Sequence, residues 1–274
     1  MKKLTPLIGT FLGLLATLSA HAYDFRNQVT ANGVEYGFHQ ADKNAPLLIT
    51  ITTDIKESMT DVYSPVGGLL AAKGYNIAAI DVTCHGRDIK KKEKYGLDCW
   101  RTRADASSEN IFDNYIQNLK SVIADIEQQQ LADTSNTTVL GISRGGYLAM
   151  KAASEIQQVS IVIALAPVTD IFRLREFDGA KAPRSIYSPQ AFFAPLSTKH
   201  LFIQINNSDD RVGTAEALET IAGITNAGGQ HAVDLTAILT PRKNHSTSEH
   251  EAAAAWALNT RKNRGESAQL AAPK

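Results

Sequence analysis

Apolar residues along this chain form short, nearly continuous runs, and stretches with apolar residues at helical spacing lie between them. Such runs are typical of strands that are buried on both faces of a sheet. We expect strands at 45–52, 75–82, 137–143, 159–167, 200–207 and 232–239. We expect helices at 62–74, 109–130, 145–156 and 214–229, the second of which places its isoleucines and leucine on one face.

This alternation of strands and helices predicts an α/β fold with a mostly parallel central sheet and helices on both faces. Ahead of the first buried run, residues 24–42 alternate apolar and polar positions around Asn32-Gly33. An Asn-Gly pair flanked by such alternation indicates a β-hairpin. The hairpin would add antiparallel strands at one edge of the sheet.

The first 22 residues have the layout of a secretory signal peptide. Two lysines precede an apolar segment, and Ala20-His21-Ala22 forms a small-x-small cleavage site. The apolar segment is shorter than the roughly 20 residues that span a membrane. We therefore expect cleavage near Ala22, export to the periplasm or beyond, a single domain from 23 to 260, and a polar tail from 261 to 274.

The charge balance gives no indication of a polyanionic partner. The chain has 28 Lys and Arg against 28 Asp and Glu, and loss of Lys2 and Lys3 with the leader leaves 26 − 28 = −2. Without a basic patch we expect no nucleic-acid partner, and without a second apolar stretch we expect no membrane span. We also expect no cofactor.

The two cysteines, Cys84 and Cys99, both lie in the exported part of the chain. In an oxidising compartment such a pair is expected to form a disulfide. The bridge would close a short charged loop and contribute about 3 kcal/mol in the chain-entropy model. Two thiols without closely spaced histidines do not fill a tetrahedral zinc site, so we expect no metal.

Two connections are longer than ordinary loops, at 84–108 and 168–199. Long insertions in a compact α/β domain are commonly active-site loops, and both of these follow the carboxyl end of an expected strand. The second contains Tyr187, Phe192 and Phe193, which either line an acyl pocket or form the insertion's own small core.

Residues 141–145, Gly-Ile-Ser-Arg-Gly, fit the pattern G-x-S-x-G between an expected strand and an expected helix. A serine on such a tight turn needs small neighbours, and this context favours Ser143 as a nucleophile. The backbone N–H of Arg144 would begin the helix and donate to an oxyanion.

A serine nucleophile needs a base and a group that orients the base. Asp209 and Asp210 follow the strand at 200–207, and His245 follows the final strand. The chain order Ser, acid, His is the one expected for a nucleophile on this kind of turn. We favour Asp209 as the acid and His245 as the base.

Alternatives stay open for both partners of the serine. Asp209 and Asp210 could instead cap the helix near 214, and Asp170 follows the preceding strand. His231 and His200 precede their strands and so lie at the wrong edge of the sheet. The other candidates for the base are His39, His85 and His250.

These motifs resemble those of the α/β-hydrolases. The segment 208–214, Ser-Asp-Asp-Arg-Val-Gly-Thr, is similar to the acid loop of the prolyl-oligopeptidase-like and dienelactone-hydrolase-like branches. Residues 79–88, Ala-Ile-Asp-Val-Thr-Cys-His-Gly-Arg-Asp, resemble the D-x-P-G-H-G segment of many members. The resemblance implies a triad of Ser143, Asp209 and His245, with the Arg144 amide as one oxyanion donor.

The chain departs from the family after the first buried strand. Members carry His-Gly or His-Gly-Gly there, and its backbone supplies the second oxyanion donor, whereas this chain has Thr52-Thr53-Asp54-Ile55. A main-chain amide can still serve, and we take that of Thr53. Asp54 would oppose a developing oxyanion unless its side chain turns away.

Arg101 and Arg103 lie close to Cys99 and are either a clamp for a substrate carboxylate or surface arginines. Together the patterns predict an exported serine esterase, closer to ester hydrolases than to peptidases, acting on a small ester or acyl substrate. The alternatives are a prolyl-oligopeptidase-like peptidase and a non-catalytic binding protein with a hydrolase fold.

Overall fold

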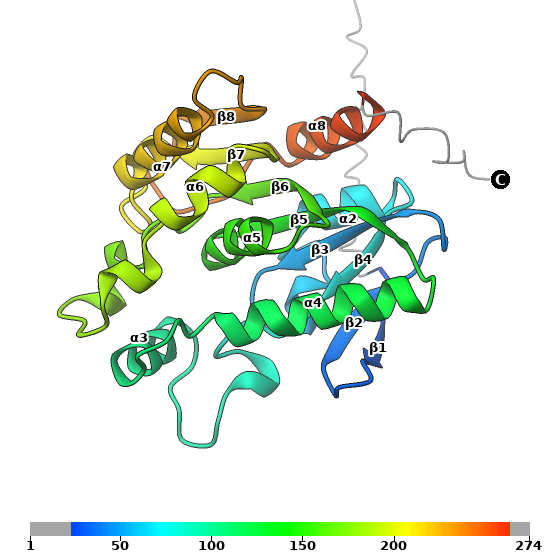
Figure 1. The fold of residues 1–274 in the computed structure, drawn as a ribbon, viewed down its shortest axis with the longest axis horizontal. Helices are drawn as coiled ribbons and strands as arrows, with labels where there is room; N and C mark the ends of the chain where they lie inside the picture. Colours follow the sequence, from blue (N-terminus) through cyan, green and yellow to red (C-terminus); the bar gives the residue numbers. More distant parts are fainter. Residues whose placement is uncertain (1–22, 264–274) are drawn as a thin grey trace, which may run out of the picture.

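The computed structural model describes residues 23–263, and the proposed signal peptide lies outside them. Within this part of the chain the strands form one sheet in the order β1-β2-β4-β3-β5-β6-β7-β8 (Figure 1). The strands are β1 Arg26–Val29, β2 Glu35–His39, β3 Pro46–Ile51, β4 Asn76–Ala79, β5 Asp133–Ile142, β6 Val159–Leu165, β7 His200–Asn206 and β8 Leu235–Thr240.

The β1–β2 hairpin and its contact with β4 are antiparallel, and all the other pairings are parallel. Gly33 adopts φ 87° in the hairpin loop, a conformation that glycine reaches without steric cost. The predicted α/β class, mostly parallel sheet and antiparallel hairpin are confirmed.

Helices cover both faces of the sheet (Figure 1). They are α1 Ile55–Ser58, α2 Pro65–Ala71, α3 Leu97–Ala106, α4 Asp113–Gln128, α5 Arg144–Glu155, α6 Gln190–Leu196, α7 Thr214–Ala227 and α8 His250–Asn263. Side chains of α4, α5 and α6 share one apolar core against the sheet, and those of α1, α2 and α8 share the core on the other face. α8 continues past 260, the expected end of the domain.

The two insertions are ordered by contacts with each other. The first carries α3, whose Leu97, Cys99, Trp100 and Ala104 are buried. The second consists of short 3₁₀ helices and α6. Arg101 of α3 donates to the backbone carbonyl oxygens of Asp178 (2.7 Å) and Gly179 (2.8 Å) in the second insertion.

The parallel register brings the carboxyl ends of the central strands to one edge. Ile51 of β3 pairs with Gly141 of β5, and Asn206 of β7 pairs with Thr240 of β8. Segments that follow these strands therefore meet, although more than one hundred residues separate Ser143 from His245. This edge is where ligands bind in open parallel sheets.

Candidate active site

Ser143 lies on a sharp turn between β5 and α5. Its backbone adopts φ 54° and ψ −116°, an unfavourable conformation for a residue with a Cβ. A Cβ on Gly145 would collide with the carbonyl oxygen of Ile51, and one on Gly141 would collide with the carbonyl oxygen of Gly145. The glycines of the motif are therefore required by close backbone approach, which holds the serine above the sheet edge.

His245 connects Ser143 to Asp209. Its Nδ1 donates to Asp209 Oδ2 at 2.8 Å, and its Nε2 lies 2.8 Å from Ser143 Oγ. A carboxylate can only accept here, so Nδ1 carries the proton and Nε2 is free to accept the serine proton. The three side chains come from segments after β5, β7 and β8, as the chain order led us to expect.

The Asp209 carboxylate is held by the loop around it. It is 4% exposed, and its Oδ1 accepts hydrogen bonds from the amides of Arg211 (2.9 Å) and Val212 (3.2 Å). Asp210 is exposed. Asp170 caps a 3₁₀ helix by accepting from the Phe172 amide and pairs with an arginine of the second insertion. Of the three candidate acids, the structure brings Asp209 to His245.

The competing histidines make other contacts. His39 bonds the carbonyl oxygen of Asp24, His200 pairs with Asp234, and His250 bonds Thr247. His231 is exposed. His85 is the exception, because it is fully buried and bonds the residue that follows the nucleophile.

Three backbone amides near the serine are candidates for the oxyanion donors. The Arg144 N–H is the first of α5, where helical geometry supplies no partner for it. In the segment that follows β3, the Thr52 amide donates to Ser58 Oγ and the Ile55 amide donates to Asp81 Oδ1. Within the described residues this leaves the amides of Thr53 and Asp54 without an intramolecular acceptor.

The Asp54 carboxylate caps the N-terminus of helix α1. Its Oδ1 accepts from the Glu57 amide at 2.9 Å and caps α1. An acidic N-cap is a favourable partner for a helix N-terminus. The carboxylate that we expected to oppose an oxyanion is thus engaged by the short helix α1.

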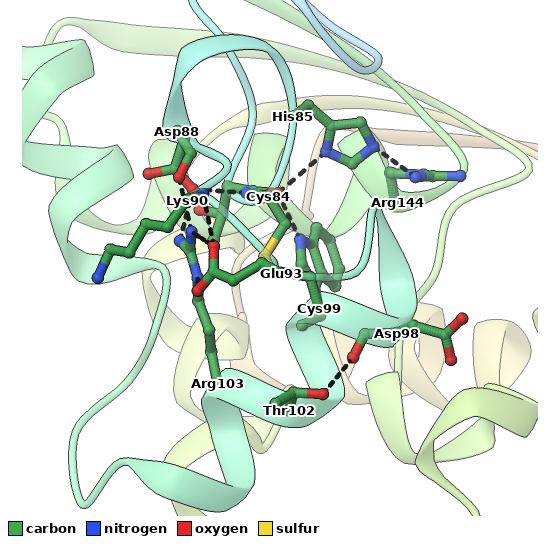
Figure 2. The surroundings of a disulfide bond; sticks show 12 residues. Cys84, His85, Asp88, Lys90, Glu93, Asp98, Cys99, Thr102, Arg103 and Arg144 are labelled. Carbon is green, nitrogen blue, oxygen red and sulfur yellow. Dashed lines mark hydrogen bonds and ion pairs between the residues drawn. A yellow bond between two sulfur atoms is a disulfide. The ribbon is translucent and has the colours of Figure 1, made fainter.

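Arg144 and His85 form a pair beside this site (Figure 2). His85 Nδ1 donates to the carbonyl oxygen of Thr83 at 3.0 Å, so Nε2 bears a lone pair and accepts from Arg144 Nη1 at 2.6 Å. Burial is the main cause that lowers the pKa of His85, to about 4, and the Arg144 charge acts in the same direction. His85 is therefore neutral near pH 7.

The expected disulfide between Cys84 and Cys99 is formed, with a Cα–Cα distance of 5.9 Å, and Cys84 directly precedes His85 (Figure 2). Trp100 Nε1 donates to the same Thr83 carbonyl oxygen at 2.7 Å. The exposed ring of Tyr95 stands edge-on to His85, with ring centroids 4.6 Å apart. The bridge thus fixes the loop that carries His85 and Tyr95.

Arg101 and Arg103 are committed to partners within the protein. Arg101 joins the two insertions and pairs with Asp105. Arg103 forms ion pairs with Asp88 and Glu93, which lowers the pKa of Glu93 to about 2. These contacts favour a structural role over the substrate clamp considered from the sequence.

The aromatic residues of the second insertion mostly face its core. Tyr187 is 1% exposed and Phe192 is 6% exposed, and both pack in the large core cluster with Tyr147 and Phe112. Phe193 is partly buried against the same cluster. Of the two alternatives left by the sequence, the contacts favour the insertion's own core.

Across residues 23–263, no group of three or more His, Cys, Asp or Glu side chains is arranged to hold a metal ion. In the same residues, no helix is both long enough and apolar enough to cross a membrane.

Comparisons with known proteins agree on the fold. The family model described as serine aminopeptidase, S33, matches residues 56–241. No curated protein matches the sequence. An esterase from Pyrococcus furiosus is 18% identical with TM-score 0.59, over 88% of this chain and 91% of that one. A cold-adapted esterase from an Arctic intertidal metagenomic library is 14% identical with TM-score 0.62, over 88% and 92%.

Peptidases with longer chains are similar as well. The acylaminoacyl peptidase of Pyrococcus horikoshii is 12% identical with TM-score 0.63. The match covers 93% of this chain and 43% of the peptidase. At these identities the structural similarity identifies a shared fold and does not identify the substrate.

Proposed function

Because the chain belongs to the serine aminopeptidase, S33, family of the α/β-hydrolases, we propose that it is an exported serine hydrolase that cleaves an ester-type bond through an acyl-enzyme on Ser143. The observation that carries the proposal is the position of His245, 2.8 Å from Ser143 Oγ on one side and 2.8 Å from Asp209 on the other. This is the geometry of a nucleophile, a base and an orienting acid.

In the proposed reaction, Ser143 Oγ attacks the carbonyl carbon while His245 Nε2 accepts its proton. Asp209 keeps the His245 proton on Nδ1 and stabilises the imidazolium. The amides of Arg144 and Thr53 hold the negative oxygen of the tetrahedral intermediate. His245 then gives its proton to the leaving alcohol, and a water molecule repeats the sequence to release the acid.

We favour an ester over a peptide as the substrate because of the share of each similar chain that this protein matches. The two esterases are matched over 91% and 92% of their chains, whereas the acylaminoacyl peptidase is matched over 43%. A peptidase remains the second candidate, because the family model is described by that activity. Export fits the disulfide of an oxidising compartment.

The test uses a fluorophosphonate probe and p-nitrophenyl esters of increasing acyl length on purified protein. We expect Ser143 to be labelled and at least one ester to be hydrolysed, and we expect Ser143→Ala to lose labelling and roughly 10⁴- to 10⁶-fold of kcat. Labelling that persists in Ser143→Ala would contradict the proposal. Labelling without turnover of esters or peptides would favour a binding protein, and turnover of peptides alone would favour the second candidate.

A further inference from the structure

Arg144 has a binding capacity that the protein itself does not use. A guanidinium has five N–H donors in a planar fork, and the structure shows one of them engaged, on His85 Nε2 at 2.6 Å. In the described part of the chain, no carboxylate lies within 4.0 Å of this guanidinium, whereas Arg101, Arg103 and Arg211 each form an ion pair. A half-buried arginine without a counter-ion is costly unless an anion completes it.

The residue that holds Arg144 cannot neutralise it. His85 gives its Nδ1 proton to Thr83 and presents a lone pair, so it orients the guanidinium as a neutral acceptor. His85 is fully buried, and the lowered pKa of its imidazole agrees with this form. The contact fixes where the fork points and leaves its charge available.

The carboxylates that face Arg144 have other partners through one oxygen each, and the Oε2 atom of Glu176 is buried without a hydrogen bond. Glu176 accepts from Arg211 Nη2 at 2.8 Å and lies 3.6 Å from Arg175. Glu57 accepts from the hydroxyl of Thr53. The remaining neighbours are Arg211, a second positive charge, and the Tyr95 phenol. The nearby charges are thus of both signs, and it is the unengaged N–H donors of the fork that favour an incoming anion.

Arg144 is also next to the reacting atom. It follows Ser143 directly, and the loop that supports it is fixed by the Cys84–Cys99 bridge and by the Gly96 amide, which donates to the carbonyl oxygen of Cys84 at 3.2 Å. Both Ser143 and Arg144 are half-buried and so reachable from solvent. Because the two residues are adjacent, the fork lies within one arginine side-chain length of the Ser143 backbone, within reach of a group on a small substrate.

We propose that the Arg144 guanidinium binds a carboxylate of the substrate, so that the preferred substrates are esters that carry an anionic group close to the scissile carbonyl. This inference rests on the proposed function of Ser143. A fork-to-carboxylate contact is charge-assisted and bidentate, and such contacts correspond to about a ten- to hundredfold preference over a neutral isostere.

The experiment compares rigid substrates that differ in charge alone. For a carboxylate on the leaving group, the pair is 4-acetoxybenzoate and 4-acetoxybenzamide. For a carboxylate on the acyl group, the pair is the mono-p-nitrophenyl ester of terephthalate and p-nitrophenyl 4-carbamoylbenzoate. The readout is the ratio of kcat/KM for the anionic and the neutral member, in which any change common to both members cancels.

We expect the unsubstituted protein to prefer the anionic member of one pair by at least tenfold, and the pair that does so identifies the side of the bond. Arg144→Met should bring that ratio to about one, and Arg144→Lys should lower it by threefold or more, because an ammonium lacks the fork. Arg26→Met, which removes an exposed arginine of β1, should change it by less than twofold. A ratio of one or less for both pairs would overturn the inference, as would an unchanged ratio in Arg144→Met.

A binding measurement separates this inference from the proposed function. Titration calorimetry of both substrate pairs uses Ser143→Ala with and without Arg144→Met, and needs no turnover. Tighter binding of the anion of one pair that is lost with Arg144→Met supports the anion subsite even where no ester is hydrolysed. Ester hydrolysis by the unsubstituted protein with equal binding within both pairs keeps the proposed function and overturns the subsite.

Discussion

Two imidazoles contact the Ser143–Arg144 turn, and their ring nitrogens have different hydrogen-bond partners. His245 has a carboxylate behind its Nδ1 and a hydroxyl in front of its Nε2. His85 has a backbone carbonyl behind and a guanidinium in front. A carboxylate stabilises the imidazolium, whereas at His85 burial and the neighbouring cation outweigh the support of the carbonyl and lower the pKa. The same side chain is therefore suited to move a proton at one position and to hold an arginine at the other.

The largest expected effect comes from making His245 resemble His85. Asp209→Asn leaves His245 with a neutral partner that cannot stabilise the imidazolium, and we expect kcat for the best ester to fall by roughly 10⁴-fold. Asp210→Asn is the matched control and should change kcat by less than about threefold, because Asp210 is exposed. Steady-state kinetics checks both variants, and a larger loss in Asp210→Asn would move the acid by one residue.

A smaller expected effect is a dependence of folding stability on pH, which arises from the lowered pKa of His85. Its pKa is about 4 in the folded protein and about 6.5 in the unfolded chain, so between these values the unfolded state binds more protons. The stability that depends on neutral His85 is complete above pH 6.5, falls as the pH drops through this window, and is lost below pH 4. The contribution is at most about 3 kcal/mol.

Urea unfolding at pH 7, 5 and 4 measures this dependence. We expect His85→Gln to flatten it in this pH window, because glutamine can accept from Arg144 without titrating. An identical pH dependence in the two proteins would show that His85 does not carry it.

The smallest effect belongs to the ring that packs on His85. Tyr95→Ala removes the edge-on contact and should lower the unfolding free energy by about 1 kcal/mol. Tyr95→Phe keeps the ring and should be close to neutral, since the phenol is exposed. Urea midpoints of the two variants provide the measurement, and equal losses in both would assign the effect to the hydroxyl.

The sequence was sufficient for the residues that follow strands. Ser143, Asp209 and His245 were placed by strand periodicity and chain order, because parallel strands end at a common edge. The helix α3 was missed inside a charged segment, although Leu97, Trp100 and Ala104 have helical spacing. The capping role of Asp54 was equally hidden, because it depends on the unforeseen helix α1.

The pairing of His85 with Arg144 could not be predicted, and neither could the partners of Arg101 and Arg103. His85 and Arg144 are 59 residues apart and no motif relates them. Arginine side chains are long enough to reach many neighbours, so their partners depend on how the insertions pack. Arg101 and Arg103 stood in the segment that suggested a clamp, whereas Arg144 was singled out for its amide alone.

The strand β8 has one neighbour in the sheet, β7, and the residue proposed as the base follows it. Because β8 is the last strand in the sequence, it can join the sheet only after the other strands have been made. A chain made from its N-terminus contains Ser143 long before it contains His245. The onset of hydrolytic turnover would thus report the completion of folding, because turnover starts only when the last strand has joined the sheet.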